Sequence, residues 1–221
     1  MMKKRKALVL GATGFVGRQL VNILLQNEQY EEVTVLVRRS LKIENKKLNE
    51  QLINFENMKT YQALFEVNDV FCCLGTTIKK AKSREHFEKV DLEYPLLAAR
   101  LAKESNAEKF LVTSAMGANS KSKFYYNRVK GNLEDKLKLV GLKSLHIFQP
   151  SLLLGERDEF RLGERIGALL MKELHVILIG PLKTYRGISG EKVAKSMLNI
   201  ALHGPQEGVH TYKSANMQET I

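Results

Sequence analysis

The stretch Gly11-Ala12-Thr13-Gly14-Phe15-Val16-Gly17 decides which fold this sequence predicts. It follows an apolar run at Ala7–Leu10 and opens a helical pattern over Phe15–Gln26, whose apolar residues recur on one face. A glycine-rich turn between a strand and a helix is the setting of a dinucleotide site, because backbone N–H groups and the positive helix end can meet a pyrophosphate there. An ordinary tight turn is the alternative. The residues expected at the phosphates are Gly11, Thr13, Gly14, Phe15, Val16 and Gly17.

Strand-like and helix-like segments alternate along most of the chain. Short runs rich in β-branched residues lie at Ala7–Leu10, Val33–Val37, Gln51–Phe55, Asp69–Leu74, Lys109–Ser114 and Ser144–Gln149. Helical periodicity separates them, most clearly over Phe15–Gln26 and Arg84–Ser105. This rhythm predicts an α/β fold of the Rossmann type, a doubly wound parallel sheet with helices on both faces.

The alternation loosens after Pro150. A helix-like stretch near Arg161–Leu170 and an apolar run at His175–Ile179 precede a helical pattern over Gly190–Leu202 and a last strand at Val209–Ser214. This tail is too short for an independent domain. We therefore expect one domain over residues 1–221, with residues 151–187 forming a small C-terminal substrate lobe over the active site at the carboxyl edge of the sheet.

Composition restricts the partners and the compartment. The chain of 221 residues has 35 Lys and Arg against 24 Asp and Glu, a formal net charge of +11. The basic groups are spread along the chain without aromatic interleaving or a zinc-finger pattern, so the sequence does not favour nucleic acid as a partner. Cys72 and Cys73 are adjacent and would point to opposite faces of a strand, so they cannot form a disulfide that stabilises the fold. No apolar window is long enough to span a membrane and no cleavage site follows the basic start, so we expect a cytoplasmic protein.

The end of the second predicted strand indicates which dinucleotide binds. An NAD site usually carries Asp or Glu there to hold the ribose hydroxyl. Here Val33–Val37 is followed by Arg38-Arg39-Ser40, and two guanidinium groups could bind the 2′-phosphate of NADP. The sequence therefore predicts NADP(H) as the cofactor in preference to NAD(H). The alternative is that one or both arginines only face water.

A candidate for acid catalysis opens a predicted helix immediately after the fifth predicted strand. Of the seven tyrosines only Tyr126 has a lysine four residues later, Lys130, and on a helix both side chains share one face. Ser114 ends the preceding strand, twelve residues upstream. A surface tyrosine beside a surface lysine, and an ordinary strand-end serine, are the alternatives. The five histidines show no metal-ligand spacing, so no metal site is expected.

These residues and the glycine turn resemble the short-chain dehydrogenase/reductase superfamily, and more closely the Tat-interacting-protein-like branch of its atypical members. The likeness is carried by Phe71-Cys72-Cys73-Leu74-Gly75-Thr76-Thr77, by Tyr126 to Gly131 in the form Tyr-x-x-Val-Lys-Gly, by Phe148-Gln149-Pro150 and by Arg161-Leu162-Gly163-Glu164. The resemblance implies NADPH binding at Arg38, Arg39, Leu74, Gly75, Thr76, Tyr126, Lys130, Leu153 and Arg161. Two positions depart from that branch: Asn54, where relatives often carry an acidic residue, and Gln149, where they often carry Arg.

The sequence predicts an oxidoreductase acting on a small carbonyl or alcohol substrate. Tyr126 would donate a proton to the substrate oxygen, Lys130 would favour the phenolate, and Ser114 would hydrogen-bond the same oxygen. An NADPH-binding sensor or regulatory interaction protein with little turnover is the alternative function. A sugar-nucleotide epimerase or dehydratase is disfavoured, because the segment after Pro150 is short for gripping a large substrate. The substrate, the direction of reaction and the oligomeric state stay open.

Overall fold

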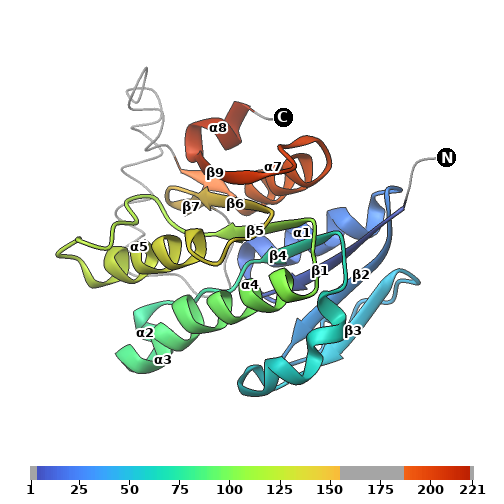
Figure 1. Ribbon diagram of the computed structural model, residues 1–221, viewed down its shortest axis with the longest axis horizontal. Coiled ribbons are helices and arrows are strands. Elements are labelled where there is room, and N and C mark those ends of the chain that lie inside the picture. Colours follow the sequence, from blue (N-terminus) through green and yellow to red (C-terminus); the bar gives the residue numbers. More distant parts are fainter. Residues whose placement is uncertain (1–3, 155–186, 220–221) are drawn as a thin grey trace.

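The computed structural model describes residues 4–154 and 187–219. Within these ranges seven parallel strands form one sheet in the order β3-β2-β1-β4-β5-β6-β9 (Figure 1). The strands are β1 (Arg5–Leu10), β2 (Tyr30–Val37), β3 (Leu48–Leu52), β4 (Asp69–Cys72), β5 (Lys109–Thr113), β6 (Ser144–Gln149) and β9 (Gly208–Lys213). The predicted doubly wound α/β fold is confirmed.

Helices cover both faces of the sheet, so its central strands are apolar on both sides. Along β1, Ala7 and Val9 join the core that includes α1 (Phe15–Gln26) and α7 (Gly190–His203). Leu8 and Leu10 point to the opposite face, where the core includes side chains of η1 (Phe55–Phe65), α4 (Tyr94–Glu104) and α5 (Tyr125–Lys138). In Figure 1, α4 and α5 lie below the sheet and α7 above it.

The shorter elements complete the described chain. They are α2 (Ile78–Ala81), α3 (Arg84–Glu88), the π-helical turn η2 (Lys89–Glu93), β7 (Leu153–Leu154), β8 (Ile188–Ser189) and α8 (Ser214–Glu219). Because α3, η2 and α4 follow one another directly, the helical stretch predicted over Arg84–Ser105 is confirmed. The strands β7 and β8 pair with each other in parallel, outside the main sheet.

Two sequence-based predictions are wrong: the bounds of the third strand, and the position of the Tyr126 helix directly after the fifth strand. The strand predicted at Gln51–Phe55 is β3 at Leu48–Leu52, because Asn54 caps η1 by accepting the N–H of Glu56 and Phe55 thus begins a helix. The helix that carries Tyr126 does not follow β5 directly, since residues 114–124 form a loop between them. The elements predicted near Arg161–Leu170 and His175–Ile179, and most of the lobe predicted over residues 151–187, lie outside the described residues.

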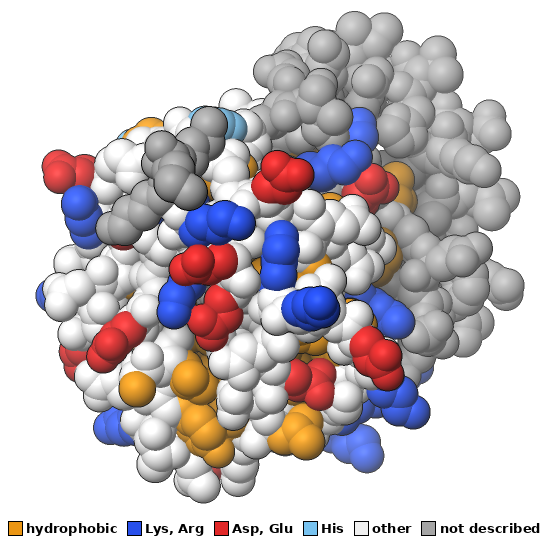
Figure 2. Space-filling view, turned by 90° about the vertical axis from the view of Figure 1, so that its right-hand side faces the viewer, with side chains coloured by type: hydrophobic (Ala, Val, Ile, Leu, Met, Phe, Trp, Pro, Cys, Tyr) orange, Lys and Arg blue, Asp and Glu red, His pale blue; other side chains and the backbone are white. Residues whose placement is uncertain are grey.

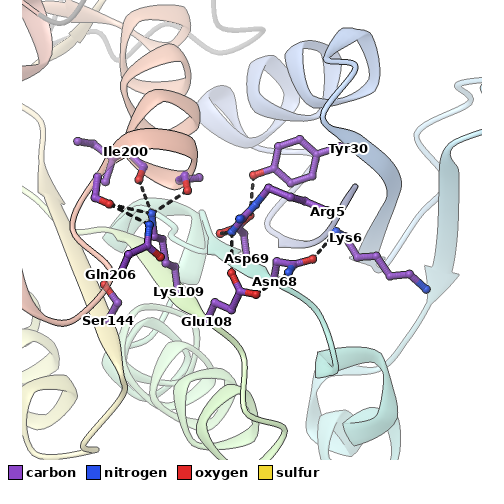
Figure 3. Close-up of polar contacts among 12 residues, drawn as sticks. Arg5, Lys6, Tyr30, Asn68, Asp69, Glu108, Lys109, Ser144, Ile200 and Gln206 are labelled. Atoms are coloured by element: carbon purple, nitrogen blue, oxygen red, sulfur yellow. Dashed lines mark hydrogen bonds and ion pairs between the residues drawn. The ribbon is translucent and has the colours of Figure 1, made fainter. Parts of the chain in front are cut away.

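A polar network fixes the amino edge of the sheet, where β1, β2 and β4 begin (Figure 3). Two guanidinium nitrogens of Arg5 each lie 2.8 Å from an oxygen of Asp69, and the Tyr30 hydroxyl donates to Asp69 Oδ2 at 2.7 Å. Asp69 is fully buried, so its carboxylate needs these donors. Because the three residues come from three adjacent strands, the network pins their mutual register.

Lys109, the first residue of β5, ties the same edge to α7. Its buried ammonium donates to the carbonyls of Ile200, Ala201 and Gly204 at 3.1, 2.8 and 3.1 Å (Figure 3). A cation at the C-terminal end of a helix matches the negative end of its dipole. The other end of α7 starts at Gly190, where a side chain would collide with the ring of Phe15, the first residue of α1 after the glycine-rich turn.

His146, in the neighbouring strand β6, is fully buried in an aromatic cluster. The Ser144 hydroxyl lies 2.9 Å from its Nε2 and the Tyr212 hydroxyl 3.0 Å from its Nδ1, while the His210 ring stacks at 5.4 Å. Burial, together with electrostatic repulsion from Lys109 and the neighbouring His210 ring, lowers the pKa of His146 to about 4. The imidazole is therefore neutral in the folded protein at neutral pH.

We expect acid to destabilise the fold through this histidine. The unfolded chain binds a proton near the ordinary value of 6.5, whereas the folded chain binds it only near a pKa of about 4. The unfolded state thus binds more protons between these values, and the free energy of unfolding falls by up to about 3 kcal/mol as pH drops through this window. Urea unfolding at a series of pH values measures the loss.

The matched variants are His146→Phe and the exposed His203→Gln. Replacing His146 should flatten the pH dependence between the two pKa values, because the proton-binding difference disappears. Replacing His203 should leave the wild-type loss in place. An equal loss in all three proteins would contradict the assignment.

Candidate functional site

The site lies at the carboxyl edge of the sheet, where the strand order reverses beside β1. The strand β2 lies on one side of β1 and β4 on the other. In open α/β sheets such a switch point leaves a crevice at the carboxyl ends of the strands, and ligands bind there. The turn after β1, the residues after β2 and the loop after β4 therefore reach one edge, although they are far apart in sequence.

The turn after β1 has the shape that a pyrophosphate requires. Gly11 has a φ of 81°, and a Cβ there would collide with the backbone carbonyl of Cys73. A Cβ on Gly17 would collide with the Gly11 carbonyl, so only glycine lets α1 begin this close to the strand. Gly14 is the N-cap of α1 and has no side chain that could cap that end. The N-terminal end of α1, with its positive dipole end, therefore lies at the crevice beside the turn.

Two distant segments meet at Lys130 of α5. The buried ammonium lies 2.7 Å from Oδ1 of Asp91, and Oδ2 of Asp91 accepts the backbone N–H of Thr76 at 2.7 Å. A Cβ built on Gly75 would lie 3.5 Å from Asp91 Oδ1 and 3.9 Å from Lys130 Nζ, so the loop after β4 passes directly over the ion pair. Gly75, Thr76 and Lys130, each predicted to bind the cofactor, are thus brought together.

Asp91 reaches this position from the π-helical turn η2. Pro95 has no N–H to donate, and in a regular α-helix its ring would clash with the carbonyl four residues earlier, that of Asp91. The helix widens instead, and the Tyr94 N–H bonds to the Lys89 carbonyl, five residues back. One proline therefore accounts for the local geometry that carries the carboxylate.

The charge of Lys130 follows from these neighbours. Burial disfavours the ammonium, but the Asp91 carboxylate and then the Tyr126 oxygen favour it, and as a result the pKa of Lys130 lies above its usual value. Lys130 is therefore a cation at neutral pH. Sequence reasoning missed Asp91, although a signal was available: it follows the buried Phe87 by four residues, on the apolar face of a predicted helix, where a carboxylate needs a cation.

Tyr126 lies on the first turn of α5, one turn before Lys130. It is half-buried, with its ring 5.8 Å from that of Phe87. A side chain on Gly131 would collide with the backbone of Asn119 and Ser120, so the glycine after Lys130 lets α5 press against the loop that follows β5. In the Tyr-x-x-Val-Lys-Gly pattern, Tyr126 and Lys130 lie one turn apart on α5, and the glycine allows the helix to pack closely against the loop.

Ser114 follows β5 at the same edge. Its N–H donates to the Phe148 carbonyl at 2.7 Å, and its Oγ is buried without a hydrogen-bond partner among residues 4–154 and 187–219. An unpaired buried hydroxyl is costly, so the Ser114 oxygen suits a place where another molecule completes the bonding.

The remaining predicted residues lie around this centre or outside the described chain. Arg38 and Arg39 are exposed directly after β2. Leu74 follows β4 and Leu153 begins β7, both half-buried, while Arg161 lies outside the described residues. Gln149 donates its amide to both oxygens of the buried Glu134 at 2.9 and 3.0 Å, so this departure from the family pattern serves packing beneath α5.

The described helices give no candidate for crossing a membrane, since none of them is both long and apolar enough. Across residues 4–154 and 187–219, no three His, Cys, Asp or Glu side chains gather in a way that could hold a metal ion.

Comparison with known proteins places this geometry in a family. A family model described as NAD(P)H-binding matches residues 11–140, more than half of the chain. The chain belongs to this NAD(P)H-binding family. The match runs from the glycine turn at Gly11 past Asp91 and Ser114 to the Tyr126 and Lys130 pair, so it covers the loops that meet at the carboxyl edge.

Relatives of this NAD(P)H-binding chain support the predicted likeness to atypical short-chain dehydrogenases/reductases, which is confirmed. Protein HTATIP2 of Rattus norvegicus is 36% identical over 167 residues, covering 74% of this chain and 69% of that protein. Protein FMP52-1, mitochondrial, of Scheffersomyces stipitis is 31% identical over 210 residues, covering 91% of this chain and 90% of that protein.

Solved structures show the same fold at low identity. A UDP-glucose 4-epimerase of Thermotoga maritima superposes with a TM-score of 0.69 at 18% identity, covering 94% of this chain and 76% of that chain. A short chain dehydrogenase family protein of Francisella tularensis superposes with a TM-score of 0.67 at 11% identity, covering 98% of this chain and 100% of that chain. At such identities these likenesses concern the fold alone.

The prediction of a cytoplasmic protein is contradicted by the relatives. FMP52-1 of Scheffersomyces stipitis and the FMP52 protein of Candida albicans, 33% identical over 156 residues and 68% of each chain, are both mitochondrial by name. The reason for the error is physical: the lack of a spanning segment constrains how a chain meets a membrane, but it does not distinguish one aqueous compartment from another.

We expect the Lys130 and Asp91 side chains to be strongly coupled in stability. Asp91→Asn or Lys130→Met alone leaves one buried charge without its partner and should lower the free energy of unfolding by about 3–5 kcal/mol. The double replacement leaves no uncompensated charge, so its loss should be clearly smaller than the two single losses combined. Urea unfolding of the four proteins measures this cycle. Additive losses would show that the pair is not a unit.

Proposed function

We propose that this chain is an NADP(H)-dependent oxidoreductase of the atypical short-chain dehydrogenase/reductase type, which transfers hydride to or from a small carbonyl or alcohol. One observation carries the proposal. The Lys130 and Asp91 ion pair lies beneath the Gly75–Thr76 loop, next to Tyr126, at the same sheet edge as the glycine turn. A cation, a phenol and a phosphate-binding turn at one edge are the parts that this chemistry needs.

Different residues at the carboxyl edge would bind different parts of the dinucleotide. The N–H groups of the turn Gly11–Gly17 would hold the pyrophosphate, and Arg38 with Arg39 would hold the 2′-phosphate. Lys130 would bind the ribose hydroxyls on the nicotinamide side while Asp91 keeps its ammonium in place. The bound cofactor supplies or accepts the hydride.

The acid chemistry would fall to side chains on α5 and directly after β5. The Tyr126 hydroxyl would donate its proton to the carbonyl oxygen of the substrate, and the Lys130 cation would stabilise the phenolate that remains. The Ser114 hydroxyl would donate a hydrogen bond to the same oxygen, which gives its orphaned Oγ a partner. In the reverse direction the Tyr126 phenolate would accept the proton of an alcohol.

We also propose that the chain forms a single domain in which residues 151–187 make a substrate lobe. Leu153 and Arg161 would then close over the nicotinamide half of the cofactor. Leu153 supports this because it follows Pro150 and packs against the same apolar core cluster as Phe15, the first residue of α1.

We expect NADPH to bind more tightly than NADH. The reason is that Arg38 and Arg39 offer charge-assisted hydrogen bonds to the additional phosphate. Replacing both by Ala should weaken NADPH binding by about tenfold or more and leave NADH binding nearly unchanged. Fluorescence titration of both nucleotides measures this, with the double variant Arg100→Ala, Lys136→Ala, which removes two exposed positive charges elsewhere, as a charge-matched control. Equal affinities of the wild type for NADPH and NADH would contradict the assignment of NADP(H) as the preferred cofactor.

We expect Tyr126→Phe to abolish most turnover without weakening NADPH binding, because it removes one hydroxyl and keeps the ring packed. The rate should fall by roughly 10² to 10⁴. NADPH consumption against a panel of aldehydes and ketones measures it, with Tyr61→Phe as the control for loss of a tyrosine hydroxyl elsewhere.

Full activity in Tyr126→Phe would remove this residue as the acid. A wild type that binds NADPH but turns over nothing in a broad panel would favour the alternative, a nucleotide sensor or regulatory interaction protein.

A further inference from the structure

Two stretches of the chain with a local excess of positive charge meet at one corner of the fold. Residues 77–88 and 120–128 hold seven Lys and Arg but only two acidic residues. The first stretch forms α2 and α3, and the second leads into and begins α5. Elsewhere the signs mix: Figure 2 shows the side of the molecule that lies to the right in Figure 1, and there basic and acidic side chains alternate.

Tyr125 joins the two stretches into one surface, here named the basic corner. Its hydroxyl lies 3.0 Å from the carbonyl of Arg84 and 3.1 Å from Oε1 of Glu88, within hydrogen-bond distance of both. The guanidinium groups of Arg84 and Arg128 lie 5.0 and 5.7 Å from the centre of the Tyr125 ring. The ring of Phe87 packs against it at 5.7 Å. In Figure 1, α2, α3 and the start of α5 accordingly share one end of the molecule.

Large apolar side chains stand among the lysines of the basic corner. Phe124 is 75% exposed and Ile78 is 48% exposed. Lys79, Lys121 and Lys123 are exposed as well, and within the described part of the chain their ammonium groups make no ion pair. Exposed apolar side chains surrounded by cations suit neither the core nor a purely aqueous surface.

We propose that the basic corner docks onto an anionic lipid surface, with Phe124 and Ile78 entering the headgroup region and the lysines meeting lipid phosphates and carboxylates. Cations and apolar groups on one face are what peripheral membrane binding requires, because each supplies a separate part of the affinity.

The composition of the corner favours lipid over nucleic acid. Five of its seven cations are lysines, which act as point charges on a diffuse anionic surface, whereas phosphate recognition in defined geometry favours Arg. Both arginines are already stacked on Tyr125. Of its two exposed apolar side chains, Ile78 is aliphatic and leaves Phe124 as a single exposed ring, whereas single-strand binding uses several rings for successive bases.

Docking through this corner would turn the carboxyl edge of the sheet toward the lipid, because Tyr126 is the next residue after Tyr125 on α5. The proposal does not depend on the oxidoreductase function, and it is tested without turnover.

The test is sedimentation of the full chain with vesicles of phosphatidylcholine alone and of phosphatidylcholine with about 30% phosphatidylserine, at about 0.1 M salt. We expect binding to the anionic vesicles only. The triple variant Lys79→Glu, Lys121→Glu, Lys123→Glu should bind at least about tenfold more weakly. Phe124→Ser, which keeps the net charge, should weaken binding about threefold or more, because an apolar anchor is lost.

The matched control changes the same number of charges elsewhere on the surface, as Lys46→Glu, Lys136→Glu, Lys143→Glu. It should keep most of the binding, and NADPH titration of every variant reports that the fold is intact. Equal losses in the two triple variants would mean that net charge alone attracts the lipid, and would overturn the proposal. Binding to single-stranded RNA through the same corner, with none to vesicles, would overturn it in favour of nucleic acid.

Discussion

A buried ammonium facing a buried carboxylate is the interaction on which the site depends. Lys130 and Asp91 lie 2.7 Å apart and both are almost fully buried, so neither charge could remain there alone. Asp91 also accepts the Thr76 N–H, and the pair therefore ties α5, the helix that includes η2, and the loop after β4 into one arrangement. Tyr126 stands one helical turn away, so the same pair places a fixed cation beside the candidate acid.

The sheet supplies the frame in which this pair is useful. Parallel strands place the ends of β1, β2 and β4 at one edge, and the network of Arg5, Tyr30 and Asp69 holds the registers of these strands from the opposite edge. Lys109 anchors the C-terminal end of α7, whose first residue packs against Phe15. The polar contacts at the amino edge thus help to position the glycine turn at the carboxyl edge, where ligands bind in open α/β sheets.

Sequence reasoning reached the parts of this account that depend on local pattern. The spacing of the glycines indicates the turn after β1. The apolar pattern of contiguous residues predicts the bounds of α1 and of β6. Asp91 could not be assigned a partner in that way, because its contact with Lys130 joins residues 39 positions apart and depends on a helix widened before Pro95. The shift of β3 has a local cause that was overlooked, since Asn54 is a good helix cap. Compartment is not encoded in the fold at all.

The most direct test of the account is a crystal structure of the complex with NADPH. We expect the ribose on the nicotinamide side within hydrogen-bond distance of Lys130 Nζ, with Asp91 still paired to that ammonium, the nicotinamide ring beside the Tyr126 hydroxyl, and the 2′-phosphate against Arg38 or Arg39. A complex in which the nicotinamide half lies away from Tyr126 and Lys130 would contradict the central claim, because the cation and the acid would then serve no hydride transfer.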